Sequence, residues 1–316
     1  MSQQKIGVVG SGLIGRSFSM IYASAGYKVV IYDIQASQLE SAQKDIWQQL
    51  VALEGQGLLR GTLTKEEQFN NISTTSCLKD CVSGAFLIQE CVPEVLDLKR
   101  RVWADVDKLV SNDVILSSST SALLPSAISE GLQHKNRFII SHPTNPPFYA
   151  PATEVVPASW TDPDVTERTL SLLKEVGQVP VLIKKEVPGF VLNRIQYAIL
   201  GECFRLIRDG VVTTEDCDLI MSQGLGVRYA FMGPWETAYL NAEGMYSYSE
   251  RYADMILNIQ KDFGEPARMD GPTLDAIQQS LEKTSAKVED LPARREWRNK
   301  RLIALAKLKQ ELNKAD

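Results

Sequence analysis

Residues 5–33, KIGVVGSGLIGRSFSMIYASAGYKVVIYD, constrain the fold of this chain more than any other stretch. The short apolar run Lys5–Val9 is typical of a buried parallel strand. Apolar residues then recur at helical spacing, and Gly26 is placed to end that helix. Lys28–Tyr32 is a second apolar run. The stretch therefore predicts a strand, a helix and a parallel strand in succession.

Three glycines, Gly10, Gly12 and Gly15, stand in G-x-G-x-x-G spacing between the first strand and the helix. The first permits a tight turn, the second lets a pyrophosphate approach the backbone, and the third lets the helix pack on the strand. Asp33 follows the second strand, where a carboxylate can accept hydrogen bonds from ribose hydroxyls and repel a 2′-phosphate. We therefore expect NAD as cofactor rather than NADP. FAD-binding domains share this fingerprint and remain an alternative.

The rest of the chain alternates strand and helix patterns as far as residue 185, after which only helices are predicted. The expected strands are 85–89, 114–117, 138–141, 154–156 and 181–183. We predict an α/β fold in which a Rossmann-like, doubly wound, mostly parallel sheet (residues 1–188) is followed by an all-α C-terminal domain (residues 189–316).

Composition excludes several classes of protein. The net charge of −5 does not indicate the basic surface that binds nucleic acid. Five cysteines without a CxxC pair, together with two histidines, argue against a metal site and for free thiols in a reducing compartment. There is no signal-peptide pattern and no apolar run long enough for a membrane helix. We expect a cytoplasmic protein with no metal and with neither a membrane nor a nucleic acid as partner.

Polar side chains gather where the predicted strands end, which is where ligands of a doubly wound sheet bind. In chain order these residues are Glu90, Glu94, Lys99, Ser118, Ser119, Thr120, Ser121, His142, Asn145 and Glu154. Asn193 and Arg194 join the list from the start of the first helix of the second domain.

His142 is the candidate general base, because removing a hydride from a secondary alcohol also releases a proton and imidazole titrates near neutrality. A carboxylate on its other nitrogen would fix the tautomer, and the connection of twelve residues lets Glu154 return beside it. Ser121 and Asn193 could bond the substrate hydroxyl and the developing charge. Alternatively, Glu154 only satisfies backbone donors and the serine run is a plain strand-to-helix turn. His134, in the polar stretch GLQHKNR, is expected on the surface.

Five segments in this order, VVGSGLIG, ECVPE, SSSTS, SHPTNPP with Glu154, and VPGFVLNR, resemble the 3-hydroxyacyl-CoA dehydrogenase family over nearly the whole chain. The resemblance implies a homodimeric, NAD-dependent dehydrogenase acting on a small hydroxy acid or its thioester. It implies that His142 and Glu154 are the catalytic pair and that Ser121 and Asn193 contact substrate. The resemblance further implies cofactor contacts, with Leu13, Ile14 and Asp33 at the adenosine diphosphate half and Glu94 and Lys99 near the nicotinamide ribose.

Finer features point within the family. The run SSSTS replaces the usual S-N-T-S of members that bind CoA, and residues 223–234 (QGLGVRYAFMGP) are similar to members that oxidise L-gulonate. We expect oxidation of the 3-hydroxyl of L-gulonate to 3-dehydro-L-gulonate. The alternatives are a 3-hydroxybutyrate or 3-hydroxyacyl-CoA dehydrogenase, or a structural protein without significant activity. A free sugar acid presents a carboxylate, so we predict that Arg228 binds it through its guanidinium. The alternative is a surface arginine or a structural ion pair.

Overall fold

The computed structural model describes residues 4–312, apart from the side chain of Gln310. The chain divides into two compact units, unit 1 (residues 1–194) and unit 2 (residues 195–316).

Unit 1 is built on one eight-stranded sheet with the order β3-β2-β1-β4-β5-β6-β7-β8. Its strands are β1 (Lys5–Val9), β2 (Lys28–Tyr32), β3 (Ile72–Thr75), β4 (Ala85–Glu90), β5 (Ile115–Ser118), β6 (Phe138–Pro143), β7 (Ala152–Pro157) and β8 (Val179–Leu182). Neighbouring strands run parallel except β6 and β7, which are antiparallel. From β1 the chain adds β2 and β3 on one side of the sheet. The next strand, β4, lies on the other side of β1, so the direction in which strands are added reverses at β1.

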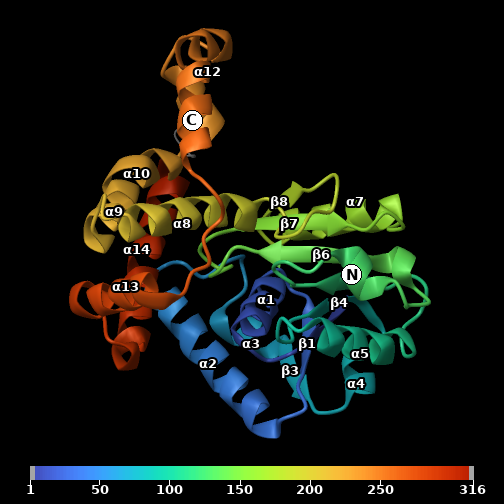
Figure 1. Ribbon diagram of the computed structural model, residues 1–316. Coiled ribbons are helices and arrows are strands. Elements are labelled where there is room, and N and C mark those ends of the chain that lie inside the picture. Colours follow the sequence, from blue (N-terminus) through green and yellow to red (C-terminus); the bar gives the residue numbers. More distant parts are fainter. Residues whose placement is uncertain (1–3, 313–316) are drawn as a thin grey trace. The chain divides into compact units, whose positions relative to one another are not determined.

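Helices cover both faces of this sheet (Figure 1). They are α1 (Leu13–Ser24), α2 (Ala36–Gly55), α3 (Lys65–Asn70), α4 (Leu78–Val82), α5 (Leu96–Asp107), α6 (Pro125–Ser129) and α7 (Pro163–Glu175). Successive strand residues alternate between two buried clusters: Ile115 packs with residues of α1, α2 and α7, whereas Leu116 packs with residues of α4, α5 and α6. This period of two is that of strands buried on both faces.

One strand of unit 1 lies outside the predicted pattern. Residues 36–70 contain two helices, α2 and α3, and residue 72 begins the edge strand β3, which is not among the expected strands. The sequence of β3, ISTT, contains one apolar side chain. β3 is held in the sheet by backbone pairing with β2. The pattern of apolar residues in a sequence does not predict such pairing.

Unit 2 is helical. Its elements are α8 (Leu192–Arg208, which begins in unit 1), α9 (Thr214–Leu219), the π-helical turn Ile220–Leu225, α10 (Gly226–Tyr229), α11 (Pro234–Leu240), α12 (Met245–Asp262), α13 (Gly271–Thr284) and α14 (Leu291–Leu312). The predicted fold class, a doubly wound, mostly parallel sheet followed by a helical region, is confirmed. Among the described residues, no helix has the length and apolar character needed to cross a membrane.

Candidate active site

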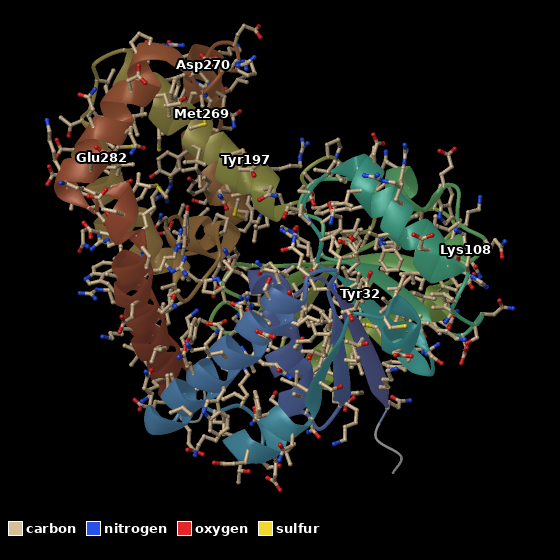
Figure 2. The ribbon with its side chains drawn as sticks, turned by 90° about the horizontal axis from the view of Figure 1, so that it is seen from below. Tyr32, Lys108, Tyr197, Met269, Asp270 and Glu282 are labelled. Carbon is tan, nitrogen blue, oxygen red and sulfur yellow. The ribbon has the colours of Figure 1, made fainter. Side chains whose placement is uncertain are left out.

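The glycine turn lies between β1 and α1, at the point where the strand order reverses. Gly10 has a φ of 107°, and its N–H donates to the carbonyl of Tyr32, which ends β2 and is labelled in Figure 2. A Cβ on Gly15 would lie 2.0 Å from the carbonyl oxygen of Gly10, so only glycine permits this packing. A Cβ on Gly12, in contrast, would meet no atom within 4 Å. Protein atoms therefore fill the space beside Gly15, whereas the space beside Gly12 is free of protein atoms.

The surroundings of this turn fit a dinucleotide. Leu13 and Ile14 open α1, so their N–H groups have no partner within the helix and can meet a diphosphate. Asp33 accepts hydrogen bonds from the backbone N–H and the hydroxyl of Ser11, which hold its carboxylate beside the turn. Leu13 is 68% exposed and Ile34 is 79% exposed, which leaves apolar surface for a base. Ile14 differs, because its side chain packs against the core and only its backbone is available.

Lys99 lies in the interior, with a side chain only 1% exposed. Its ammonium is 2.9 Å from Glu90 Oε1, 3.1 Å from the Val92 carbonyl and 3.4 Å from Glu94 Oε2. An ammonium has three protons, and each has an oxygen here. Glu94 is the member of this cluster that reaches the surface, with a side chain 40% exposed. In this arrangement the ammonium of Lys99 is paired with oxygens of the protein, and one of them belongs to Glu94.

Glu94 organises the turn after β5. Its Oε1 accepts hydrogen bonds from the hydroxyl of Thr120 and from the N–H groups of Ser121 and Ala122. Burial alone would raise the pKa of Glu94, but the bond from Thr120, the charge of Lys99 and the two amides outweigh it and lower the pKa. The carbonyl of Ser121 in turn accepts from Asn193 Nδ2 at 2.7 Å. The structure thus brings Glu94, Ser121 and Asn193 into one network.

His142 and Glu154 are directly opposite each other in the antiparallel pair β6 and β7. His142 Nδ1 lies 2.8 Å from Glu154 Oε2, and both side chains are 7% exposed. The pairing places Glu154 beside the end of β6, as expected for a strand that returns after twelve residues. A carboxylate accepts, so Nδ1 carries a proton, and in the neutral ring Nε2 then keeps its lone pair. The pair can accept a proton at Nε2 while Glu154 stabilises the resulting imidazolium.

The other carboxylate oxygen of Glu154 accepts hydrogen bonds from the N–H groups of Val191 (2.8 Å) and Leu192 (2.9 Å), where α8 begins. One oxygen of Glu154 therefore meets the histidine and the other meets backbone donors, so Glu154 does not satisfy backbone donors alone. Burial would raise the pKa of Glu154, but the bonds from His142 and the two amides outweigh it and lower the pKa. The carboxylate is thus held in its charged form.

Two further residues named by the sequence analysis, Arg228 and His134, have other surroundings. Arg228 is an exposed residue of α10 in unit 2, and among the described residues no carboxylate forms an ion pair with it. His134, which we expected on the surface, is partly exposed: its side chain is 16% exposed, with Nδ1 2.8 Å from Asp107 Oδ1 and Nε2 2.6 Å from Asn112 Oδ1. These partners are distant in sequence, so the polar stretch around His134 gave no sign of them.

Sequence reasoning about individual site residues missed Phe190 and the role of Glu90. Glu90 is fully buried and also accepts a hydrogen bond from Ser118. Phe190 is fully buried, and its ring centroid lies 5.7 Å from that of His142. The only available signal was position: Glu90 ends a predicted strand, and Phe190 stands in the Pro-Gly-Phe run before Asn193.

The chain is similar to known proteins over nearly its whole length. Residues 5–187 match the model of the 3-hydroxyacyl-CoA dehydrogenase NAD binding domain, and residues 189–279 match that of the family's C-terminal domain. The chain is 47% identical over 306 residues to lambda-crystallin of Oryctolagus cuniculus, covering 96% of each chain. It is 36% identical over 257 residues to L-carnitine dehydrogenase of Bacillus cereus, covering 81% of this chain and 77% of that one.

A similar solved structure is that of 5-formyl-3-hydroxy-2-methylpyridine 4-carboxylic acid 5-dehydrogenase, an NAD⁺-dependent dismutase. It superposes with a TM-score of 0.81 at 28% identity, covering 96% of this chain and 98% of that one. The matched domains cover most of the chain in the order expected from its motifs. The chain therefore belongs to the 3-hydroxyacyl-CoA dehydrogenase family, with an N-terminal domain that binds NAD.

Proposed function

We propose that this protein oxidises the 3-hydroxyl of L-gulonate to 3-dehydro-L-gulonate, with His142 and Glu154 as the general base pair. The observation that carries the proposal is the buried contact of 2.8 Å between His142 Nδ1 and Glu154 Oε2, on the sheet that also holds the glycine turn. Bound NAD would supply the hydride acceptor. The reaction releases one proton for each hydride transferred, and the protein must take up that proton.

In this proposal His142 Nε2 receives the proton of the substrate 3-hydroxyl, and Glu154 stabilises the imidazolium until the proton passes to water. Ser121 and Asn193 hold the substrate oxygen, which becomes a carbonyl. The Asn193–Ser121 contact supports a shared role, since it ties the start of α8 to the turn after β5. Glu94 and Lys99 act on the nicotinamide side, with Lys99 acting through Glu94.

The choice of L-gulonate rests on the resemblance of residues 223–234 to gulonate-oxidising members and on the likeness to lambda-crystallin. NADH formation, followed by the absorbance of the reduced cofactor, tests it. L-gulonate would be compared with L-3-hydroxybutyrate and L-carnitine, and acetoacetyl-CoA would be tried in the reverse direction. We expect L-gulonate to give the highest kcat/KM. A higher value for another substrate would overturn the gulonate assignment, and no turnover with any would favour a structural protein.

We also propose that Arg228 binds the substrate carboxylate, either in its own chain or in the second copy of a dimer. Its support is the absence of a competing ion pair among the described residues. A charge-assisted contact contributes about 1.5–3 kcal/mol, so Arg228→Met should lower kcat/KM for L-gulonate by about 10- to 150-fold. Arg251→Met is the matched control, because Arg251 is half-exposed and already paired with Glu243. A decrease below about threefold for Arg228→Met would contradict the role, since it leaves less than about 1 kcal/mol for the contact.

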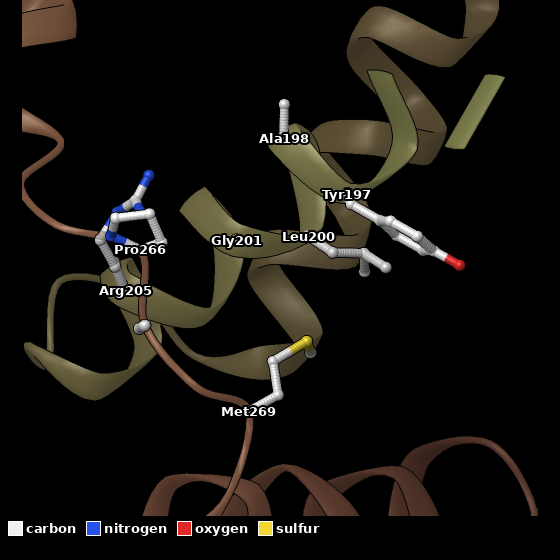
Figure 3. A pocket seen from close by; sticks show the side chains of 8 residues that line it. Tyr197, Ala198, Leu200, Gly201, Arg205, Pro266 and Met269 are labelled. Atoms are coloured by element: carbon white, nitrogen blue, oxygen red, sulfur yellow. The ribbon is translucent and has the colours of Figure 1, made fainter. Parts of the chain in front are cut away.

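We propose that the helical region from residue 189 provides substrate contacts and the interface of a cytoplasmic homodimer. Unit 2 buries few apolar side chains: among its described residues these are Phe204, Cys217, Ala242 and Ile303. No residue of α12 or α13 is buried. A pocket of about 340 Å³ beside α8, lined by apolar side chains such as Tyr197, Leu200 and Met269, belongs to this uncovered surface (Figure 3). A second copy is the simplest cover, since a two-fold axis brings the same apolar helices together.

Light scattering should therefore give twice the chain mass of 35.2 kDa. Replacing Met255 and Ile259, two exposed residues one turn apart on α12, with glutamate should shift the mass toward the monomer. Asn258→Glu on the same helix adds charge at an exposed polar position and is the control. A monomeric wild-type protein would exclude the homodimer, and an unchanged dimer in the double variant would place its interface elsewhere.

A further inference from the structure

The backbone turns sharply just before α8. Gly189 has a φ of 74°, and the next residue, Phe190, has a φ of 52°. The left-handed region is unfavourable for a bulky L-residue, and such residues persist only where the surrounding structure requires them. Among the described residues, Phe190 and Glu243 are the non-glycine residues with positive φ. Glycine, the least strained residue at such a site, does not occupy position 190.

The side chain of Phe190 explains why a strained position keeps an aromatic residue. Phe190 is 0% exposed and belongs to the buried cluster that includes Ile140 and Val156, on the strands of His142 and Glu154. Its ring centroid lies 5.7 Å from that of His142, with the planes inclined by 54°. This separation is within the range of favourable aromatic pairs. The ring therefore packs beside the imidazole on one side.

The same turn also holds the carboxylate partner of the histidine. The two residues after Phe190, Val191 and Leu192, donate their N–H groups to Glu154 Oε1. Glu154 Oε2 meets His142 Nδ1. A right-handed backbone at Phe190 would redirect both the ring and the two amides, so one conformation serves both members of the pair.

We infer that Phe190 is a positioning residue that holds the imidazole of His142 in the orientation and tautomer set by Glu154. This role rests on the proposed function of His142 as general base, but the orientation of the ring can be measured without substrate. Phe190 acts through His142 and contacts no reacting atom in this assignment.

Magnetic resonance gives the direct test, because the chain has only two histidines. In the neutral form of His142 in the wild-type protein, ¹⁵N shifts should show a proton on Nδ1 and none on Nε2. Nuclear Overhauser contacts should join its ring protons to those of Phe190. In Phe190→Leu and Phe190→Met the His142 signals should broaden or move toward tautomer averaging, while those of His134 stay unchanged. Two variants are used so that a folding failure of one leaves the other, and the wild-type contacts need neither.

Phe138→Leu is the matched control, since Phe138 is also 0% exposed in the same cluster but packs edge-on against Trp103. We expect the Phe190 variants to lower kcat by about 10- to 100-fold, as misplacement of a catalytic group does. The KM for NAD should stay within about twofold, because a positioning role leaves ground-state binding intact. Phe138→Leu should lower the stability of the protein. Its kcat should fall only by the fraction of the protein that is unfolded.

The positioning role would be overturned if the wild-type spectra showed no Phe190–His142 contacts. It would also be overturned if the Phe190 variants had the same spectra and kcat as Phe138→Leu. Absence of dehydrogenase turnover in the wild-type protein would overturn the proposed function instead. In that case the ¹⁵N shifts still decide whether Phe190 orients His142.

Discussion

His142 and Glu154 form a buried pair across two antiparallel strands, with Nδ1 of the histidine 2.8 Å from Oε2 of the glutamate. Backbone pairing sets this distance, because the two residues face each other in the register of β6 and β7. The pair is therefore part of the sheet and does not depend on a loop for its geometry. Its chemistry can be tested one residue at a time.

His142→Gln should remove most turnover and leave NAD binding near normal. General base catalysis contributes about 10²- to 10⁴-fold, and glutamine cannot accept the proton. The glycine turn and Asp33 use none of the His142 contacts, so the cofactor site should persist. Steady-state kcat and the Kd for NAD from fluorescence titration measure the two effects. A large loss of NAD affinity would show that His142 is structural.

Glu154→Gln should lower both activity and stability. The amide cannot fix the histidine tautomer as a carboxylate does, so we expect kcat to fall by about 100-fold or more. The loss of charge-assisted bonds to the histidine and two amides should cost about 1.5–3 kcal/mol of unfolding free energy at neutral pH.

The stability effect of Glu154 should depend on pH in a defined direction. Its pKa is lowered in the folded protein, mainly by His142 and the amides acting against the effect of burial. The ionised group therefore stabilises the fold above the unfolded value of about 4.3, and this contribution disappears as pH falls through the folded pKa. Urea unfolding should show a large difference between wild type and Glu154→Gln at pH 7 and a small one near pH 3. A constant difference across this range would contradict the assignment.

The sequence predicted those features that depend on local pattern. KVVIY and FIIS are largely apolar runs, and each forms a strand of the sheet. The chain length from His142 to Glu154 allowed the return of a strand, although not its antiparallel register. The edge strand β3 was missed because its stability comes from pairing with β2, and three of its four residues are polar or hydroxylated.

Tertiary partners explain what the sequence did not predict within the site. Lysine is a residue type usually found on the surface, but Lys99 is buried, and Glu90 and Glu94 compensate its charge in the interior. Glu154 meets two amides that lie 37 and 38 residues further along the chain. No local pattern reports a contact at that separation. The positive φ of Phe190 is equally hidden, since an aromatic residue gives no local signal for a left-handed backbone.

Asp33→Ser should reduce the preference for NAD over NADP. The carboxylate of Asp33 is held by the hydroxyl and N–H of Ser11, beside the glycine turn. Its negative charge would repel a 2′-phosphate, and serine removes that charge. We expect the ratio of kcat/KM values for NAD and NADP to fall by about tenfold or more, which corresponds to about 1.4 kcal/mol. An unchanged ratio would mean that another group sets the cofactor preference.

Gly12→Ala should separate cofactor binding from folding. Gly12 has a φ of −67°, which alanine also adopts, and its new Cβ would meet no protein atom within 4 Å. The melting temperature should therefore stay unchanged or rise, since alanine restricts the unfolded chain. If a pyrophosphate approaches the backbone there, the methyl group occupies its place and the Kd for NAD should rise by about tenfold or more.

Two other glycines complete this test. Gly131→Ala also introduces a Cβ with no neighbour within 4 Å, but outside the turn, so it should leave both the melting temperature and NAD binding unchanged. Gly15→Ala would place its Cβ 2.0 Å from the Gly10 carbonyl oxygen, so it should lower the melting temperature and NAD affinity together. Calorimetry with and without NAD measures all three variants. Normal NAD affinity in Gly12→Ala would show that the diphosphate does not lie against this turn, because open space at Gly12 is what the binding site requires.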